Sequence, residues 1–485
     1  MTIAVLSVAS EAWPLLKTGG LADVVGALPD AVAPHGVKMT NMLPGYPAVM
    51  NAIGKGKVIH RYDSLLGAGA QILYAKAHNL LVLDAPALFT REAGPYADAQ
   101  GRDWADNWQR FAALSRAAAD LASGAVKGQA FDILHAHDWQ AALAPAYLRY
   151  GATGEPAGNT PVPSVMTIHN IAFQGYFGPE IFPRLELPRG AWAIDGVEYH
   201  GGVGFLKAGM EAASAITTVS PSYAAEIRNA EFGLGLEGLI VSRGDRVSGI
   251  LNGIDSAIWN PATDEHLSAP FTARTLKSRR INKRAVEASF GLDQDDGPLF
   301  IVVSRLTWQK GIDVLLEVLD HLVGMGGRLA LLGSGDAALE AGLHAAAGRH
   351  PGRIAVRIGY DEALSHQMQG GGDAILVPSR YEPCGLTQLY GLAYGCVPVV
   401  ARTGGLADSV IDANPAAIAA KVATGIQFTD VTYDNLAHAI TRACRLYAQP
   451  PVWQTIQKCG MRADFSWGQS GKAYADLYAR LMRGE

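Results

Sequence analysis

Short apolar runs without polar interruption recur along the chain, and each is followed by a segment whose apolar residues recur at helical spacing. The first run is Ile3–Ala9, the helical pattern covers 21–32, and Val37–Leu43 is the second run. Uninterrupted runs of this kind are typical of strands buried on both faces, as in parallel sheets covered by helices. The pattern therefore predicts right-handed β-α-β units and an α/β fold.

The same alternation continues to the second half, where it is more regular. Further strands are predicted at 80–83, 133–136, 164–168, 215–219, 299–303, 329–332, 354–358, 374–377 and 397–401. A stretch rich in Asn, Gly, Asp and Pro at 247–264 interrupts the pattern. We expect two doubly wound domains, residues 1–246 and 247–462, and a C-terminal segment, 463–485, that contains an amphipathic helix.

Composition excludes several classes of protein. The 485 residues carry a net charge of −5, which does not favour nucleic acid or an anionic membrane as a partner. The four cysteines have no CxxC spacing, so neither a disulfide framework nor a zinc site is expected. We expect no metal, no cofactor, no signal peptide and no membrane span, and therefore a cytoplasmic protein.

One string occurs twice, each time between a predicted strand and a predicted helix. It reads Lys17-Thr-Gly-Gly-Leu-Ala-Asp near the start and Arg402-Thr-Gly-Gly-Leu-Ala-Asp near the end. A cation beside a bare Gly-Gly backbone at a helix start favours a bound anion, because free N–H groups and the helix dipole both attract negative charge. The chain is therefore expected to bind a phosphorylated ligand.

Two further loops follow predicted strands of the second half. Ser-Arg305-Leu-Thr-Trp-Gln-Lys310 supplies two cations that can neutralise a diphosphate. Ser-Arg-Tyr-Glu382-Pro-Cys384-Gly-Leu-Thr387 supplies a carboxylate and the amides of a predicted helix start at Gly385. Since ligands bind at the carboxyl ends of strands in open α/β sheets, both loops are candidate site loops.

Two loops of the first half end predicted strands with polar residues. They read His135-Ala-His137-Asp138-Trp and Thr-Ile-His169-Asn. The two histidines of the first loop have spacing compatible with a metal, but no third ligand is evident. Asp138 and His169 are the candidates for contacts to sugar hydroxyls or for acid–base chemistry.

Taken in order, the strings KTGGLADV, HAHDW, TIHN, NGID, SRLTWQKG, SRYEPCGLTQL and RTGGLADSV cover nearly the whole chain. The chain thereby resembles the bacterial glycogen synthase and plant starch synthase family of retaining glucosyltransferases. The resemblance implies a GT-B architecture, in which two Rossmann-like domains face each other across a cleft. It also implies transfer of glucose from ADP-glucose to the non-reducing end of an α-1,4-glucan such as glycogen, and a C-terminal helix that packs back on the first domain.

The resemblance also implies roles for individual residues. Arg305 and Lys310 hold the distal phosphate, Glu382 and His169 line the glucose pocket, and Asp138 contacts donor or acceptor sugar. Tyr360 is expected to stack on adenine. The remaining donor contacts expected are Lys17, Gly19, Gly20, Asn252, Cys384, Gly385, Leu386 and Thr387.

One residue departs from the wider pattern of retaining GT-B enzymes. Many relatives carry a second glutamate eight residues after the first, whereas this chain has Tyr390 at that distance from Glu382. Four alternatives stay open: UDP-glucose as the donor, a sugar-nucleotide epimerase, an NAD-dependent oxidoreductase and a non-catalytic glucan-binding protein. The incomplete glycine fingerprint at Gly333-Ser-Gly335 argues against the oxidoreductase.

Overall fold

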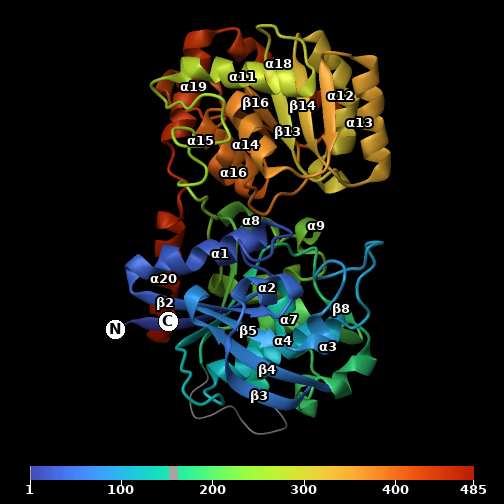
Figure 1. The fold of residues 1–485 in the computed structure, drawn as a ribbon, viewed down its shortest axis with the longest axis vertical. Helices are drawn as coiled ribbons and strands as arrows, with labels where there is room; N and C mark the ends of the chain where they lie inside the picture. Colours follow the sequence, from blue (N-terminus) through green and yellow to red (C-terminus); the bar gives the residue numbers. More distant parts are fainter. Residues whose placement is uncertain (1, 152–161) are drawn as a thin grey trace. The chain divides into compact units, whose positions relative to one another are not determined.

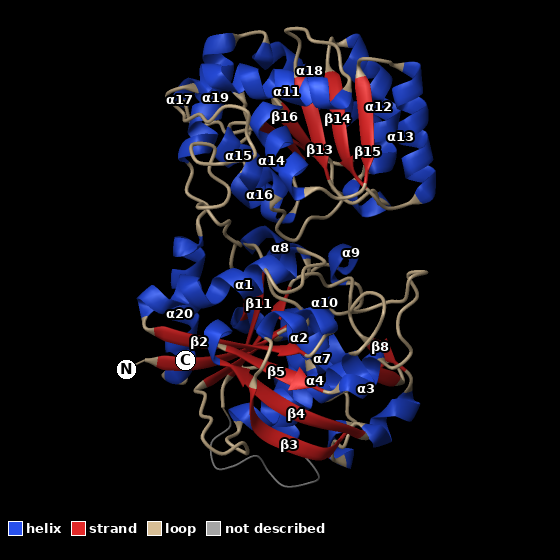
Figure 2. Cartoon of the chain, viewed as in Figure 1, coloured by secondary structure: helices blue, strands red, loops and turns tan. Residues whose placement is uncertain are grey.

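A computed structural model of the chain describes residues 2–151 and 162–485 (Figure 1). These residues form two compact units, the first comprising Met1–Gly253 with Trp467–Glu485 and the second Ile254–Ser466. Each unit is built on one central sheet with helices packed against it (Figure 2). The prediction of two doubly wound α/β units is thus confirmed.

The sheet of the first unit has nine strands in the order β12-β11-β7-β6-β1-β2-β5-β4-β3. Seven of these strands are parallel, and the apolar runs of the sequence predicted all of them but β12. The strands are β1 (Ile3–Val8), β2 (Val37–Pro44), β3 (Lys57–Leu65), β4 (Ala68–Ala75), β5 (Leu80–Asp84), β6 (Ile133–His137), β7 (Ser164–Ile168), β11 (Ala215–Thr218) and β12 (Val247–Gly249). A separate small sheet contains β8 (Tyr176–Phe177), β9 (Glu198–Tyr199) and β10 (Gly202–Gly204).

The sheet is not wholly parallel, because β4 runs antiparallel to both β3 and β5. Neither β3 nor β4 was among the strands predicted from the sequence. Polar residues divide the edge strand β3 (KVIHRYDSL), and Gly69 and Gln71 interrupt β4 (AGAQILYA), so neither has the continuous apolar run of the central strands.

Helices of the first unit cover both faces of its sheet. On one face, α1 (Gly20–Val32) and the C-terminal helix α20 (Trp467–Met482) share a core with β1, β2, β6 and β7. Tyr474, Leu477 and Tyr478 of α20 are buried in that core. The other helices are α2 (Pro47–Ile53), α3 (Pro86–Phe89), α4 (Asn107–Ala122), α5 (Asp138–Ala141), α6 (Leu143–Tyr150), α7 (Phe205–Ala212), α8 (Pro221–Glu226), α9 (Ala230–Gly233) and α10 (Glu237–Ser242).

The second unit has a six-stranded parallel sheet in the order β15-β14-β13-β16-β17-β18. Its strands are β13 (Leu299–Val303), β14 (Arg328–Gly333), β15 (Ile354–Ile358), β16 (Ala374–Val377), β17 (Val397–Ala401) and β18 (Ile426–Phe428). The last of these, β18, follows the predicted strand at 397–401 and was not predicted. β18 has only three residues, too few for a clear apolar run.

Alternate residues of β13 face two different cores. Phe300 and Val302 pack with α12 (Ile312–Gly324) and α18 (Tyr433–Tyr447), while Leu299 and Ile301 pack with α11 (Arg279–Phe290) and α14 (Glu362–Gly371). Because both faces are buried, the strand has no polar alternation. The remaining helices are α13 (Ala337–Arg349), α15 (Thr387–Tyr394), α16 (Gly404–Ser409), α17 (Pro415–Ala420) and α19 (Pro450–Arg462).

The unit boundaries differ from the expected 246/247 and 462/463. β12 pairs with β11, which keeps the chain in the first unit as far as Gly253. The chain returns to the first unit at Trp467. Within the second unit, the Ile254 N–H donates to the Phe465 carbonyl at 2.8 Å, so the first and last segments of this unit run side by side.

Candidate active site

In each sheet the strand order reverses at one point, and the candidate loops follow the strands at that point. In the second unit the chain moves from β13 outward to β15 and then returns to β16, so β13 and β16 flank the reversal. In the first unit β1 and β6 do so. Ligands bind in the crevice outside the carboxyl ends of strands at such a reversal. The fold therefore supports the loops chosen from the sequence.

The loops after β13 and β16 meet through an ion pair. Lys310 Nζ contacts Glu382 Oε2, and the Ser379 hydroxyl donates to the same oxygen at 2.9 Å. The two charged side chains are 16% and 9% exposed. The pair is therefore largely removed from water. Electrostatic interactions in such a buried position are stronger than those at the surface. A cation and a carboxylate thus lie side by side at the edge of the sheet.

Arg305 differs from Lys310 in being exposed. Within the described residues its guanidinium forms no salt bridge or side-chain hydrogen bond. The guanidinium has five N–H donors that suit phosphate oxygens. Arg305 is therefore accessible to an anionic ligand.

The second copy of the repeated string supports the Glu382 loop. The Gly405 N–H donates to the Glu382 carbonyl at 3.1 Å, and Gly404 has φ of +43°. A Cβ on Gly404 would overlap the Glu382 carbonyl, and one on Gly405 would overlap the Cys384 carbonyl. These glycines are needed for close backbone approach. This copy therefore has a structural function in holding the 382–384 backbone.

The segment after Glu382 begins its helix later than expected. α15 starts at Thr387 and not at Gly385, which has φ of +71°. Cys384 is buried, and its carbonyl accepts a hydrogen bond of 3.1 Å from Gln388 Nε2. Cys384, Gly385 and Leu386 thus form the connection between Glu382 and the helix. Their predicted donor contacts stay predictions.

Two other predicted contacts come from other segments of the chain. Tyr360 follows the edge strand β15 and is 68% exposed, so its ring is available for stacking. Asn252 is buried near the end of the first unit's long segment, and its Oδ1 has no hydrogen-bond partner in the described part of the chain. Neither observation tests the role that was predicted.

A carboxylate that sequence reasoning missed organises the first copy of the string. Glu11 is buried, and its carboxylate accepts hydrogen bonds from the Thr18 N–H and, at 2.8 Å, from the Thr18 hydroxyl. Tyr96 donates to it at 3.1 Å. Burial raises the pKa of Glu11 despite these hydrogen bonds and one from the backbone of Gly19. The only sequence signal was a charged residue three positions after the end of a buried strand.

Lys17 in the same loop is also held in place. Its ammonium forms a salt bridge of 2.9 Å with Asp23 and lies over the Trp13 ring. Both members of the pair are partly exposed. The Gly19 backbone already hydrogen-bonds to Glu11, so we expect the Lys17 ammonium to be the main group of this loop that binds an external anion. The contacts expected of Gly19 and Gly20 stay predictions.

Asp138 lies where β6 meets α5, in a left-handed backbone conformation with φ of +54°. Its Oδ1 accepts hydrogen bonds from the backbone N–H of His169 at 2.7 Å and of Asn170 at 3.4 Å. Burial raises the pKa of Asp138 to about 7, and the nearby Glu11 contributes in the same direction. Asp138 thus ties the His169 loop to the end of β6, and a conformation of this kind at a loop is common in functional sites.

The histidines form a buried, hydrogen-bonded cluster. His135 hydrogen-bonds Thr167 through Nε2 at 2.6 Å and Tyr478 of α20 through Nδ1 at 2.7 Å. His137 Nδ1 lies 3.0 Å from His169 Nε2. Burial lowers the pKa of His135 and of His169 to about 3, and that of His137 well below its ordinary value. Among the described residues no group of three or more His, Cys, Asp or Glu side chains is placed to hold a metal ion.

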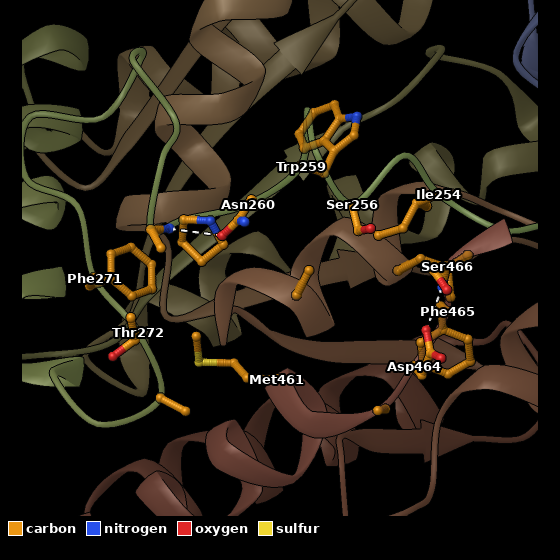
Figure 3. A pocket seen from close by; sticks show the side chains of 16 residues that line it. Ile254, Ser256, Trp259, Asn260, Phe271, Thr272, Met461, Asp464, Phe465 and Ser466 are labelled. Carbon is orange, nitrogen blue, oxygen red and sulfur yellow. Dashed lines mark hydrogen bonds between the residues drawn. The ribbon is translucent and has the colours of Figure 1, made fainter. Parts of the chain in front are cut away.

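A cavity of about 310 Å³ lies within the second unit (Figure 3). It is lined by the segments 254–262, 271–273 and 461–466 and by Leu389 and Ala393 of α15. None of the predicted site residues lines it. The candidate site is thus defined by the strand-end loops. In the part of the chain that the structure describes, each helix is too short or too polar to cross a lipid bilayer.

Two Rossmann-like units with polar loops at their strand reversals define the GT-B class of glycosyltransferase folds. The starch synthase catalytic domain model matches residues 4–242, and the glycosyl transferases group 1 model matches residues 286–451. Glycogen synthase of Novosphingobium aromaticivorans is 70% identical over 484 residues, 99% of each chain. That of Rhizobium rhizogenes is 58% identical over 480 residues, again 99% of each.

Solved structures agree with these matches. The catalytic domain of starch synthase IV from Arabidopsis thaliana, bound to ADP and acarbose, superimposes with a TM-score of 0.86 at 29% identity and full coverage of both chains. Sucrose-phosphate synthase from Thermosynechococcus elongatus, at 17% identity and a TM-score of 0.61 with full coverage of both, shares the fold. The chain belongs to the glycogen synthase and starch synthase family of glycosyltransferases.

Proposed function

We propose that this protein transfers glucose from ADP-glucose to the non-reducing end of an α-1,4-glucan, with retention of the α configuration and release of ADP. The observation that carries the proposal is the Lys310–Glu382 pair at the strand reversal of the second unit. A cation beside a carboxylate suits a ligand that joins a phosphate to a sugar, since the cation attracts phosphate and the carboxylate accepts sugar hydroxyls.

The chemistry proposed is departure of the diphosphate, assisted by positive charge. The bond between the anomeric carbon and the distal phosphate oxygen breaks, and the acceptor 4-hydroxyl forms the new bond on the same face. The hydroxyl proton leaves with a phosphate oxygen. Arg305 and Lys310 stabilise the negative charge that grows on the leaving group, which is where fixed charges lower a barrier most.

Both units contribute residues to this proposal. Lys17, Asp138 and His169 belong to the first unit, whereas Arg305, Lys310 and Glu382 belong to the second. Retaining glycosidases use two carboxylates, one as nucleophile and one as acid, at a fixed separation. Asp138 and Glu382 belong to different units, so we do not assign them as such a pair. We therefore assign Glu382 to binding glucose hydroxyls and His169 to the sugar pocket.

The donor nucleotide and the location rest on the relatives. The solved starch synthase IV structure is bound to ADP, which supports an adenine nucleotide for the present chain. The exposed Tyr360 ring supports stacking on the base. A cytoplasmic location is supported by the bacterial glycogen synthases that match along the whole chain and by four cysteines that are free thiols.

The test is incorporation of labelled glucose into glycogen from ADP-glucose and, separately, from UDP-glucose. We expect incorporation from ADP-glucose and a much lower rate from UDP-glucose. Equal rates would overturn the donor assignment. Consumption of either donor without glucose entering the polymer would favour the epimerase.

A further inference from the structure

Ser7 and His137 are two buried residues, linked by hydrogen bonds to His169, that have no role in the site described so far. His137 ends β6, and its ring joins two neighbours: Nδ1 lies 3.0 Å from His169 Nε2, and Nε2 lies 3.3 Å from the Ser7 hydroxyl on β1. Ser7 and His137 are fully buried. The three side chains therefore form a hydrogen-bonded line from Ser7 on β1 through His137 to His169 after β7.

Each neutral histidine in this line has only one N–H proton to donate. A neutral imidazole carries one N–H, so it donates through one nitrogen and accepts through the other. Burial keeps His137 and His169 neutral, because it lowers the pKa of His169 to about 3 and that of His137 well below its ordinary value. The two hydrogen bonds of His137 must therefore have opposite directions.

Ser7 selects between the two directions. Within the described residues its hydroxyl has no hydrogen-bond partner other than His137. If Ser7 accepted from His137, its own O–H would be buried without an acceptor, which disfavours that arrangement by about tenfold or more. The favoured order is that Ser7 donates to His137 Nε2 and His137 donates through Nδ1 to His169 Nε2. His169 then carries its proton on Nδ1.

We propose that Ser7 and His137 are positioning residues that hold His169 in the tautomer protonated on Nδ1, so that His169 offers an N–H donor to an oxygen of the bound sugar. Within the described residues no protein group hydrogen-bonds to His169 Nδ1. Asp138 fixes the backbone of His169 through its N–H at 2.7 Å, so both the main chain and the ring are held. His169 acts as a hydrogen-bond donor and not as a base. The sugar as ligand rests on the proposed function.

The first test reads the tautomer directly in the full-length protein without substrate. Protein labelled with ¹⁵N-histidine is examined at pH 7.5 by multiple-bond ¹H–¹⁵N correlation, and the His169 signals are assigned from the spectrum of H169Q. We expect a protonated Nδ1 and a bare Nε2 at His169. A protonated Nε2 at His169 would overturn the proposal. In S7A we expect both tautomers of His169. A spectrum unchanged from the wild type would contradict the role proposed for Ser7.

The second test uses a matched pair of variants at His137. An asparagine amide reaches the position of Nδ1, and a glutamine amide reaches that of Nε2. H137N therefore keeps a donor to His169 and loses the contact to Ser7, whereas H137Q does the reverse. We expect H137N to keep kcat within about threefold and H137Q to lose about tenfold to 100-fold, the loss expected for one misdirected buried hydrogen bond.

Equal kcat values for the two variants would contradict the positioning role, because each loses one buried hydrogen bond of the same side chain. Thermal melting of both variants checks that they are folded to a similar degree. The spectrum needs no substrate, so it separates this inference from the proposed function. A wild type that shows the Nδ1 tautomer but extends no glucan would refute the function and leave the tautomer assignment standing.

Discussion

Lys310 is the residue whose removal tests the leaving-group chemistry most simply. Its ammonium contacts Glu382 at the strand reversal. If the ammonium acts mainly on the charge of the departing diphosphate, K310A lowers kcat by about 10²–10³. The measurement is turnover at saturating ADP-glucose with a glucan acceptor. K277A, at an exposed lysine of the same unit, is the control and keeps wild-type turnover. Full turnover by K310A would contradict the assignment.

The buried histidines predict that the first unit is labile to acid. Between about pH 3 and 6.5 the unfolded chain binds protons at His135, His137 and His169 that the folded unit does not bind, because burial lowers all three pKa values. Asp138 and Glu11 have raised pKa values and oppose this with at most two protons. The free energy of unfolding therefore decreases by about 1–2 kcal/mol for each pH unit, averaged from pH 6.5 to 5.

Hydrogen exchange of β6 amides as a function of pH, corrected for the intrinsic exchange rate, measures this slope. The control is H438Q, at an exposed histidine of the second unit, which leaves the slope unchanged. A free energy of unfolding that stays constant or rises on acidification from pH 6.5 to 5 would contradict the burial of the three neutral histidines.

At the scale of secondary-structure elements, glycines that pack against a neighbouring backbone are expected to tolerate no side chain. At Gly405 a side chain would overlap the Cys384 carbonyl, whereas at Gly348 in α13 a Cβ meets nothing within 4 Å. G405A must displace the 382–384 backbone, so it lowers both kcat and the melting temperature. G348A raises the free energy of unfolding by about 0.5–1 kcal/mol, because alanine favours the helix. Activity and melting of G405A equal to the wild type would disprove the support given to Glu382.

The C-terminal helix α20 makes a second prediction at this scale. Leu477 is buried in the core that α20 shares with α1 and β1. L477A decreases the free energy of unfolding of the first unit by about 2–5 kcal/mol, as expected for a buried leucine. K472A on the exposed side of the same helix changes it by less than about 0.5 kcal/mol. Urea denaturation compares the two, and equal effects would show that α20 is not part of the core.

Elements with strong local patterns could be predicted, and those without could not. The runs at Ile3, Leu299 and Val397 lie in strands buried on both faces, and burial of both faces leaves a continuous apolar signal. Polar residues divide β3, Gly69 and Gln71 interrupt β4, and β18 has three residues. Strands of this kind form because of the neighbours they pair with, and a propensity pattern along a single segment does not show that pairing.

At the scale of the whole molecule, the candidate loops could be predicted because each follows a recognisable strand. What the sequence could not show is which side chains the sheet order brings together. Ser7 and His137 are 130 residues apart and become neighbours because β1 pairs with β6. Glu11 is a further example, since its function depends on a loop that turns back toward it. Contacts across strands are set by topology, which single-sequence patterns constrain only weakly.

The central claim is that the chain transfers glucose to a glucan, and the structure of the product tests it most directly. The full-length protein is incubated with ADP-glucose and a short α-1,4-linked oligosaccharide, ADP release is measured, and the product is analysed by mass spectrometry and NMR. The account predicts chains lengthened one hexose at a time, each new unit α-1,4-linked at the non-reducing end, with one ADP released per unit. Release of ADP without lengthened chains, or a new β linkage, would contradict it.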